Sequence, residues 1–334
     1  MTETRTVFVA PGQGSQRPDL FQLAKRFPEV HETYEAADEI ALELFGPSRV
    51  GGKSISEWAK NGTQDELATN TVITQPLIIA TSIGLIKYLR SREDGTTAYG
   101  HSVGELAALF AASCATEEDT LKLSMLRGLY SHEASLASSG KMAALLNVPH
   151  DFLNKIKFGE KEGVVVSTTN NPDQLTISGR KEQVEAIVAD IRAKYQQVRG
   201  MTKEERRQLP NAVILKIGSG FHSFMMKPAQ KAYRESLDSI DISVPTNMNF
   251  FSNYSHDYEG HPDTIRDHLE RQLIHPVDFW KDIGRLIAGG HTRIVEVGPN
   301  GVLTEGLKEQ QTKGRLPKHV QLVAAESEIL GIVS

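Results

Sequence analysis

The sequence predicts an α/β fold, with a mostly parallel, hydrolase-like sheet covered by helices and an inserted ferredoxin-like subdomain. Short apolar runs alternate with helical periods through residues 1–137, which is typical of parallel strands joined by helices. Between residues 138 and 217 the order changes to strand, helix, strand, strand, helix, strand, as in a ferredoxin-like unit. A Gly-His-Ser-Val-Gly sequence at 100–104 stands between a β-prone run and an apolar helix, which is the setting of a nucleophile elbow.

The predicted large domain comprises residues 1–137 and 218–334. Its apolar runs and helical periods define a first strand, several helices, the elbow with its strand and helix, a late strand and a terminal helix. Their expected positions are 7–10 (strand), 20–45 and 75–91 (helices), 96–100 (elbow strand), 103–113 and 119–130 (helices) and 293–297 (strand), followed by Gly-Pro-Asn-Gly and the terminal helix.

The predicted small subdomain spans residues 138–217. Its expected strands are 142–148, 164–169, 175–178 and 213–217, and its expected helices are 151–157 and 181–195. The longer helix places Val184, Ile187, Val188 and Ile191 on one face, which predicts an amphipathic helix packed on a sheet. A charged segment at 200–211 precedes the last strand, and its interpretation stays open between a lid, a partner contact and a solvated insertion.

Composition excludes several classes of protein. The chain has 334 residues, of which 39% are apolar and 24% charged, and a net charge of -5 without long basic runs. That balance gives no electrostatic footprint for nucleic acid or an anionic membrane. The single cysteine, Cys114, excludes an intrachain disulfide and is expected to be a small buried thiol. No apolar run is expected to approach the length of a membrane span and no signal-peptide pattern is present, so a cytoplasmic protein is expected.

The elbow makes Ser102 the candidate nucleophile. Gly100 and Gly104 permit the sharp turn that lifts its hydroxyl to a helix N-terminus, although a glycine-flanked serine without catalytic duty has the same pattern. A serine hydroxyl needs a general base. Among eleven histidines, His222 is the candidate because it follows a predicted strand and a Gly-Ser-Gly turn, and loops at strand ends carry functional residues. His101 cannot readily turn back onto its neighbour and is expected to face the substrate or support the site.

Six motifs in order resemble the malonyl-CoA:acyl carrier protein transacylases, the stand-alone enzymes of fatty-acid synthesis and the related acyltransferases of polyketide synthases. They are Pro-Gly-Gln-Gly-Ser-Gln at 11–16, Gly-His-Ser-Val-Gly-Glu at 100–105, Leu-Arg-Gly around Arg127, Phe-His-Ser at 221–223, Arg-Gln-Leu-Ile-His-Pro-Val at 271–277 and Glu-Val-Gly-Pro at 296–299. The resemblance covers nearly the whole chain. The fold of that family also contains an inserted ferredoxin-like unit.

The resemblance implies a role for each matching residue. Ser102 would be the nucleophile and His222 its base. Gln13 and the backbone N–H of Val103 would form an oxyanion hole, which stabilises the alkoxide of the tetrahedral intermediate. A backbone carbonyl at Gln272 would orient the histidine, so that no aspartate is needed.

Two further residues bear on the acyl group. The resemblance makes Arg127 the clamp for the free carboxylate of malonate, because a planar guanidinium meets a carboxylate with two parallel hydrogen bonds. Without the resemblance, a surface arginine would be expected there. Phe221 would fill the space of an α-methyl group and so favour malonyl over methylmalonyl, by about 1–3 kcal/mol at most.

The expected reaction moves a malonyl group from malonyl-CoA, through an ester on Ser102, to the phosphopantetheine thiol of an acyl carrier protein, in fatty-acid or, by preference, polyketide biosynthesis. Neither a metal nor a bound cofactor is required, and no nucleic-acid or membrane partner is expected. The carrier is normally acidic, so Lys216, Lys227 and Arg206 are candidates for a basic patch.

Three alternatives remain. One is a hydrolase on the same scaffold that removes acyl groups from carrier proteins. Another is a generic esterase that uses His291 or His319 as its base. The third is a docking subunit with a vestigial elbow.

Overall fold

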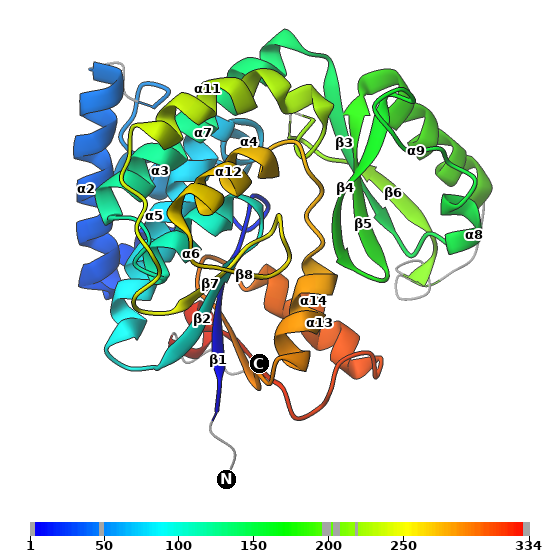
Figure 1. Ribbon diagram of the computed structural model, residues 1–334. Helices are drawn as coiled ribbons and strands as arrows, with labels where there is room; N and C mark the ends of the chain where they lie inside the picture. The colour runs from blue at the N-terminus through cyan, green and yellow to red at the C-terminus, as the bar shows by residue number, and fades with distance from the viewer. Residues whose placement is uncertain (1–3, 47–49, 196–201, 203–207, 218–219, 330–334) are drawn as a thin grey trace.

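The computed structural model describes residues 4–46, 50–195, 202, 208–217 and 220–329, which form a larger and a smaller part (Figure 1). The larger part surrounds a six-stranded sheet, and the smaller part, green in Figure 1, carries a separate four-stranded sheet. This arrangement confirms the predicted fold class.

The large sheet has the order β10-β9-β1-β2-β7-β8 and is parallel except for the last pair. Its strands are β1 (Thr6–Ala10), β2 (Gly95–Gly100), β7 (Asn249–Phe251), β8 (Tyr258–Glu259), β9 (Arg293–Glu296) and β10 (Gln321–Ala324). The elbow strand β2 pairs with β1 so that Gly100 stands opposite Ala10. Both strands therefore end at the same edge of the sheet, beside the segment 11–16.

Alternation along β1 divides the core of the larger part between the two faces of the sheet. Phe8 and Ala10 belong to the larger cluster, which helices within residues 21–137 cover, whereas Val7 and Val9 belong to a cluster with residues of the helices at 279–288 and 302–312. Because successive side chains of a strand point to opposite faces, a strand that is buried on both faces carries consecutive apolar residues, as β1 does over residues 7–10.

The helices of the larger part begin at recognisable caps. Ser54 and Thr63 each accept from the backbone N–H three residues later, while Glu57 and Glu66 reach back to them, which completes two capping boxes. The helices are α1 (Phe21–Arg26), α2 (Pro28–Phe45), α3 (Ile55–Asn61), α4 (Gln64–Thr69), α5 (Thr71–Arg90), η2 (Ser102–Gly104), α6 (Glu105–Ala111), α7 (Glu117–Ala137), η3 (Phe224–Met226), α11 (Lys227–Asp238), α12 (Pro262–Gln272), α13 (Phe279–Ala288), α14 (Val302–Thr312) and α15 (Ala325–Ile329).

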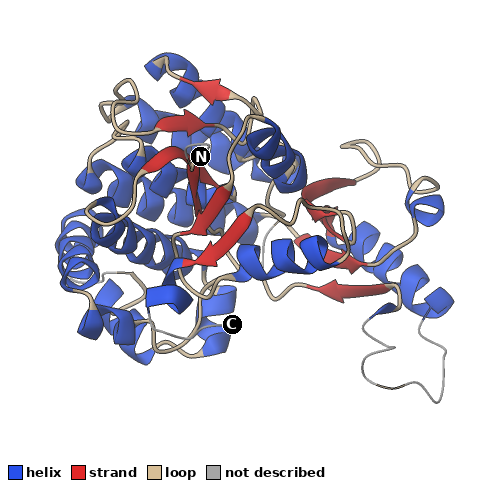
Figure 2. Cartoon of the chain, turned by 90° about the horizontal axis from the view of Figure 1, so that it is seen from below, coloured by secondary structure: helices blue, strands red, loops and turns tan. Residues whose placement is uncertain are grey.

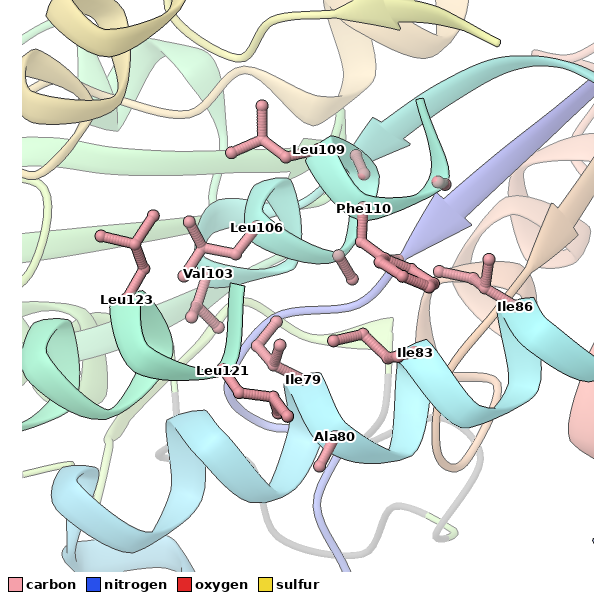
Figure 3. Packing of buried hydrophobic residues seen from close by; sticks show 14 of the residues in the cluster. Ile79, Ala80, Ile83, Ile86, Val103, Leu106, Leu109, Phe110, Leu121 and Leu123 are labelled. Carbon is pink, nitrogen blue, oxygen red and sulfur yellow. The ribbon is translucent and has the colours of Figure 1, made fainter. Parts of the chain in front are cut away.

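Helix α6 packs against α5 and α7 directly behind the elbow (Figure 3). Leu106 and Phe110 of α6 lie in the same cluster as Ile79 and Ile83 of α5 and Leu121 of α7. All seven residues of α6 are buried. The apolar run after the elbow therefore anchors its helix in the core on every side.

Helix α5 corrects one expectation from the sequence. Its 20 residues are long and apolar enough to cross a membrane by length and composition, although the sequence was expected to contain no such run. In the structure 83% of the relevant window is buried inside the protein. An all-round apolar helix of this kind is also typical of the centre of a large core.

The smaller part has the strand order β4-β5-β3-β6 with every pair antiparallel. Its elements are β3 (Gly140–Leu146), α8 (His150–Leu153), β4 (Val164–Asn171), β5 (Gln174–Arg180), α9 (Lys181–Tyr195) and β6 (Asn211–Ile214). Val184, Val188 and Ile191 of α9 are buried against the sheet, as their spacing predicts. Figure 2 shows this sheet standing apart from the main one.

The two parts are joined by more than the chain crossings. Backbone bonds link β4 to the segment after α12, since Thr169 N–H donates to the Val277 carbonyl and Val277 N–H donates to the Ser167 carbonyl, both at 2.9 Å. On the other side, Asp173 at the β4–β5 turn pairs with Lys313 at 2.8 Å and with Arg315 at 2.6 Å. The smaller part is thus fixed against two separate segments of the larger one.

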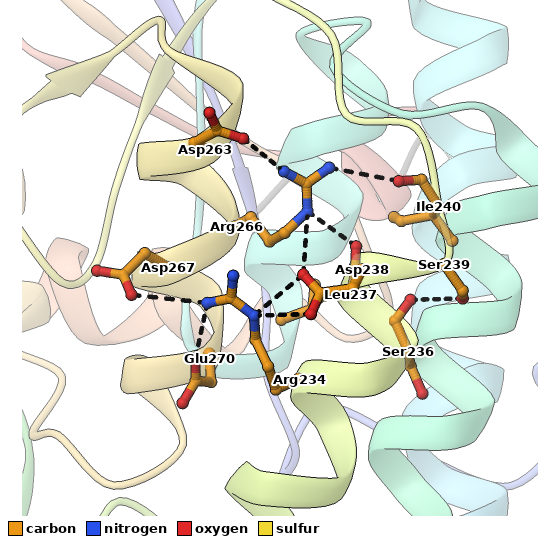
Figure 4. Close-up of polar contacts among 10 residues, drawn as sticks. All are labelled: Arg234, Ser236, Leu237, Asp238, Ser239, Ile240, Asp263, Arg266, Asp267 and Glu270. Atoms are coloured by element: carbon orange, nitrogen blue, oxygen red, sulfur yellow. Dashed lines mark hydrogen bonds and ion pairs between the residues drawn. The ribbon is translucent and has the colours of Figure 1, made fainter.

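Arginine side chains tie α11 to α12 (Figure 4). Arg266 of α12 donates to the carbonyl of Leu237, in the last turn of α11, at 2.9 Å and to that of Ile240, just beyond the helix, at 3.4 Å. It thus supplies a donor to a carbonyl near the helix end that lacks a helical partner. Arg234 of α11 reaches Glu270 of α12 at 3.0 Å. Because His222 precedes α11 and Gln272 ends α12, these contacts help set the separation of two candidate site segments.

Several boundaries differ from those expected. Residues 20–45 form two helices, because Phe27 adopts an extended conformation between α1 and α2. The last strand of the smaller part is β6, and it ends at residue 214 instead of 217. Most of the charged segment 200–211 lies outside the described residues, so its proposed lid or partner role stays a prediction.

Candidate active site

Ser102 stands on a strained turn between β2 and α6. Its φ of 55° is in the left-handed region that non-glycine residues rarely adopt. The glycines on either side allow the close packing of this turn. A Cβ on Gly100 would lie 2.1 Å from backbone atoms of Gly104, and one on Gly104 would lie 2.2 Å from the Ala10 carbonyl oxygen. The elbow predicted from Gly-x-Ser-x-Gly is therefore formed, with both glycines required by contact.

His222 lies against the serine hydroxyl. Its Nε2 is 2.7 Å from Ser102 Oγ. Its Nδ1 faces two backbone carbonyls, that of Gln272 at 2.9 Å and that of His275 at 3.1 Å. Because carbonyls only accept, Nδ1 carries the proton and Nε2 is left to accept from the serine hydroxyl. Burial, and then the charge of Arg127, lower the pKa of His222 to about 3.

Arg127 is buried, 3% exposed, so it is not the surface residue that would be expected there without the resemblance. One Nη atom donates to Gln75 Oε1 at 2.9 Å and the other to Gln272 Oε1 at 3.0 Å. No carboxylate pairs with it among the described residues. Burial lowers the pKa of Arg127, and the charge of Glu105 acts in the opposite direction. The guanidinium is thus a buried cation held by neutral amide oxygens.

Gln13 joins the same set of amides. Gln75 Nε2 donates to Gln13 Oε1 at 3.1 Å, while Gln13 Nε2 is buried without a hydrogen-bond partner. Gln13 lines the cavity above Ser102. The preceding Gly12 brings this segment onto the elbow, because a Cβ there would lie 2.7 Å from the His101 carbonyl oxygen.

A cavity of about 310 Å³ opens over Ser102 between the two parts of the molecule. The larger part contributes the segment 11–15 and Phe221 to its lining, and the smaller part contributes residues of β3, β4 and β5. Most of the lining is apolar, and Met142, Leu215 and Ile217 lie in it. Phe221 is 5% exposed and packs in a cluster with Met142.

His101 lies on the cavity wall and not on the serine hydroxyl. Its Nε2 is 3.1 Å from Asn170 Oδ1 of β4, and its ring contacts the Phe279 ring edge-on at 5.6 Å. Burial lowers the pKa of His101 to about 4. The elbow is thus hydrogen-bonded to the smaller part through a neutral imidazole.

Three residues at the site were not anticipated from the sequence. Asn253 accepts from Ser102 N–H at 3.0 Å and its side chain donates to the Gly100 carbonyl. Glu105 accepts from Asn253 N–H at 2.7 Å and from Gln272 Nε2 at 2.5 Å. The third is Gln75. A signal existed for Asn253, because a polar residue just after a buried strand falls at the edge of the sheet where sites assemble.

Other candidates lie away from Ser102. His291 bonds to Thr97 at 2.9 Å and to the Leu286 carbonyl at 2.9 Å, and His319 is exposed. Neither histidine is therefore placed as an esterase would require. Cys114 is fully buried, and burial raises the pKa of its thiol to about 12, so the thiol stays protonated.

Two of the three candidates for a basic patch are paired with acidic residues. Lys216 pairs with Asp65 at 2.5 Å and Lys227 pairs with Glu160 at 2.8 Å, while Arg206 lies outside the described residues. Within the described part of the chain, no group of three or more His, Cys, Asp or Glu side chains is arranged to hold a metal ion.

Known proteins resemble the chain over almost its whole length. Residues 7–327 match the acyl transferase domain family. The chain is 32% identical over 313 residues to the malonyl CoA-acyl carrier protein transacylase of Bacillus subtilis (strain 168). The aligned region covers 92% of this chain and 90% of that protein. It is 30% identical over 302 residues to the polyketide biosynthesis malonyl CoA-acyl carrier protein transacylase of the same organism. That aligned region covers 89% of this chain and 94% of the relative. Among solved structures, the malonyl-CoA:acyl carrier protein transacylase from Xanthomonas oryzae pv. oryzae superposes with a TM-score of 0.80 at 26% identity and covers 99% of this chain and 98% of that one.

Proposed function

The chain belongs to the acyl transferase domain family, among the malonyl-CoA:acyl carrier protein transacylases, and on that premise we propose that it transfers malonyl groups from malonyl-CoA to an acyl carrier protein through an ester on Ser102. The hydrogen bond of 2.7 Å between Ser102 Oγ and His222 Nε2 supports the nucleophilic step. The buried Arg127, which no carboxylate pairs among the described residues, supports malonyl as the acyl group.

The burial and the neutral partners of Arg127 are the main evidence that the acyl group is malonyl. A buried cation with only neutral acceptors is poorly compensated for the loss of water. The free carboxylate of a malonyl group would supply the missing charge and accept two hydrogen bonds from the guanidinium. An acetyl group offers no such partner, so Arg127 favours malonyl in the ground state and in the transition state.

The cycle has two halves. His222 takes the proton of Ser102 as Oγ attacks the thioester carbonyl, and it returns that proton to the departing thiol of CoA. The phosphopantetheine thiol of the carrier then gives its proton to His222 and attacks the acyl-serine ester, and the serine recovers a proton as it leaves. The two carbonyls at Nδ1 keep the imidazole in the tautomer that both halves need.

Gln13 and the backbone N–H of Val103 are proposed as the oxyanion hole. The position of Gln13 in the cavity lining supports its part, and that of Val103, directly after the nucleophile in η2 and just before α6, supports the other. Loss of one such donor typically lowers kcat by about 10²–10³.

We assign the enzyme to polyketide biosynthesis in preference to fatty-acid synthesis. The Phe-His-Ser triplet at 221–223 supports this preference, and a relative from each kind of pathway is similar to the chain. Loading a polyketide-type and a fatty-acid-type carrier in parallel tests the assignment. A carrier of the fatty-acid type loaded at the higher kcat/KM would contradict it.

Intact-mass spectrometry after brief incubation with malonyl-CoA, and then with a phosphopantetheinylated carrier protein, tests the reaction. We expect a malonyl adduct on the wild type, none on Ser102→Ala, and an unaffected adduct on Ser91→Ala, an exposed serine at the end of α5. Arg127→Ala should slow malonyl loading by about 10- to 100-fold, as the loss of charged hydrogen bonds implies.

The second step of the same experiment separates transfer from hydrolysis. Passage of the malonyl group to the carrier supports the transacylase. Release of free malonate with the carrier left unloaded would show a hydrolase and contradict the proposal.

A further inference from the structure

Glu105 is a buried carboxyl group that the proposed reaction does not use. It is the first residue of α6 and only 1% exposed. Oε1 accepts from Asn253 N–H at 2.7 Å and Oε2 accepts from Gln272 Nε2 at 2.5 Å. Burial raises the pKa of Glu105 to about 8 against the effect of these donors. Burying a carboxyl group costs free energy. The two hydrogen bonds that its oxygens accept therefore indicate that Glu105 positions the groups that donate them.

Gln272 connects Glu105 to the rest of the site. Its amide nitrogen donates to Glu105 and also to the Ser102 carbonyl, at 2.8 Å. Its amide oxygen accepts from Arg127 at 3.0 Å, and its backbone carbonyl faces His222. One glutamine thus contacts the nucleophile segment, the base and the candidate carboxylate clamp.

The direction of the Gln272 amide matters because its two ends have opposite polarity. If the amide were turned over, its N–H groups would point at the guanidinium of Arg127, and its oxygen would face Glu105 and the Ser102 carbonyl. Each of those contacts would place donor against donor or acceptor against acceptor. Both oxygens of Glu105 face N–H donors. Above the pKa of about 8 the ionised carboxylate accepts only, and it therefore holds the amide in the direction that serves Arg127.

Charged and titratable groups on the surrounding elements bear on Glu105. Arg127 of α7 is the cation, whereas Glu259 of β8 is a further acid that opposes its ionisation. Tyr99 of β2 and Tyr233 of α11 are buried phenols with raised pKa values. Arg127 is therefore the one cation in this set. The amide of Gln272 lies between it and Glu105, so the two side chains do not form a direct ion pair.

We propose that Glu105 is a positioning residue for malonyl recognition, whose carboxylate fixes the amide of Gln272 and through it the guanidinium of Arg127. The inference rests on the proposed function, since it takes Arg127 to be the clamp for the malonyl carboxylate. Glu105 touches neither the acyl group nor the reacting atoms. Its effect should therefore appear in the preference for malonyl over acetyl and not in acyl transfer as such.

Glu105→Gln is the direct test. An amide at position 105 can accept on one side only, so either Asn253 N–H or Gln272 Nε2 then faces a donor. At about pH 9, where Glu105 is ionised, we expect the ratio of malonyl to acetyl loading of Ser102, from malonyl-CoA and acetyl-CoA, to fall about tenfold or more, as expected for a lost charged hydrogen bond. Glu105→Asp keeps two acceptors and should retain part of the preference.

Glu296→Gln is the matched control. Glu296 of β9 is also 1% exposed, and burial raises its pKa to about 7, but it accepts from Thr304 N–H at 2.7 Å and not from Gln272. Its substitution should leave the malonyl-to-acetyl ratio unchanged. An equal fall of that ratio in both variants would overturn the proposal.

A double-mutant cycle tests the route through Arg127. In an Arg127→Ala background, Glu105→Gln should no longer change the ratio, because residues that act through one another are not additive. Additive effects, or equal losses with both acyl groups, would overturn the proposal. If Glu105→Gln does not fold, Gln272→Met keeps the backbone carbonyl and breaks the same link, and an unchanged ratio there would also overturn it.

The outcomes also separate the two proposals. A wild type that acquires no malonyl group contradicts the proposed function. A wild type that is loaded normally, while Glu105→Gln keeps its preference, contradicts only the role of Glu105.

Discussion

At the scale of single residues, the site rests on polar groups that are buried and matched to one another. His222, Arg127 and Glu105 are at most 3% exposed, so their protonation depends on their partners and not on solvent. The two carbonyls at His222 Nδ1 and the two amide oxygens at Arg127 set the donor pattern of each. The matched hydrogen bonds fix the geometry of the site. Removing any one partner is expected to lower the stability of the protein, because a buried polar group is then left unpaired.

Burial gives His222 a characteristic dependence on pH. Its pKa is lowered to about 3, so we expect kcat/KM for acetyl loading, which does not depend on Glu105, to stay flat between pH 8 and 5. A kinetic pKa near 6.5, the ordinary value for histidine, would contradict the geometry.

Because the folded-state pKa of His222 is depressed, its neutral form contributes stability above the unfolded pKa, and that stability is lost as pH falls toward the folded value. The melting temperature of Ser102→Ala, followed as a function of pH, checks this effect in the absence of turnover.

Phe221 sets a prediction on acyl size. It lines the cavity and packs with Met142, so Phe221→Leu should open room near the α-carbon of the acyl group. We expect the methylmalonyl-to-malonyl ratio of loading to rise by about tenfold, within the range for a single methyl group. Ala229, a buried member of the same cluster that is absent from the cavity lining, offers a control, because Ala229→Gly should leave the ratio unchanged.

At the scale of elements, close packing of backbone groups explains the elbow turn better than the conformational propensities of its residues do. The turn that carries Ser102 depends on backbone groups packed too closely for any Cβ at Gly100 or Gly104. Helix α6, buried all round between α5 and α7, fixes that turn from behind. The strained φ of Ser102 persists because this surrounding structure is over-determined.

Gly104→Ala tests the packing of the elbow. A Cβ there would lie 2.2 Å from the Ala10 carbonyl oxygen, so strand β1 or the elbow must move. We expect a loss of about 3 kcal/mol or more in the free energy of unfolding, measured by chemical denaturation. Gly284→Ala in α13 is the matched control, because nothing lies within 4 Å of its Cβ, and it should stabilise by about 0.5–1 kcal/mol.

At the scale of the whole molecule, the cavity exists because the smaller part is held over the elbow. Backbone bonds join β4 to Val277, only two residues beyond the His275 carbonyl that faces His222. The opposite side is held at Asp173. Partial burial raises the pKa of this carboxyl, but bonds from Arg315 and Lys313 outweigh it and hold the pKa at about 2.

Asp173→Asn should loosen this second contact between the parts. We expect faster hydrogen exchange in the β4–β5 turn and a fall of about 1 kcal/mol in stability, since the cluster is only partly buried. Asp263→Asn removes an exposed ion pair to Arg266 and should change neither quantity. If exchange in the turn were unaltered, the Asp173 contacts would not hold the two parts together.

The sequence by itself determined the fold class, the order of the subdomain strands and the elbow. These follow from local physics, since periodicity marks buried faces and a serine between two glycines before an apolar helix permits one kind of turn. It also indicated His222, Gln272 and Arg127 through their resemblance to a known family. The sequence pattern did not predict the boundaries between consecutive helices, nor an apolar run as long as α5. Packing in the core overrides the local pattern at these places.

Only the tertiary structure decided which polar groups meet. Gln75, Glu105 and Asn253 come from three separate segments. Asn253 is marked only by its place just after a strand and Glu105 only by its place beside the elbow, and neither position shows which groups these side chains meet. Their hydrogen bonds around Ser102 arise because β2 and β7 are neighbours and α12 ends beside the elbow. Contacts between residues as far apart as 102 and 272 depend on the path of the whole chain, so no window of sequence contains them.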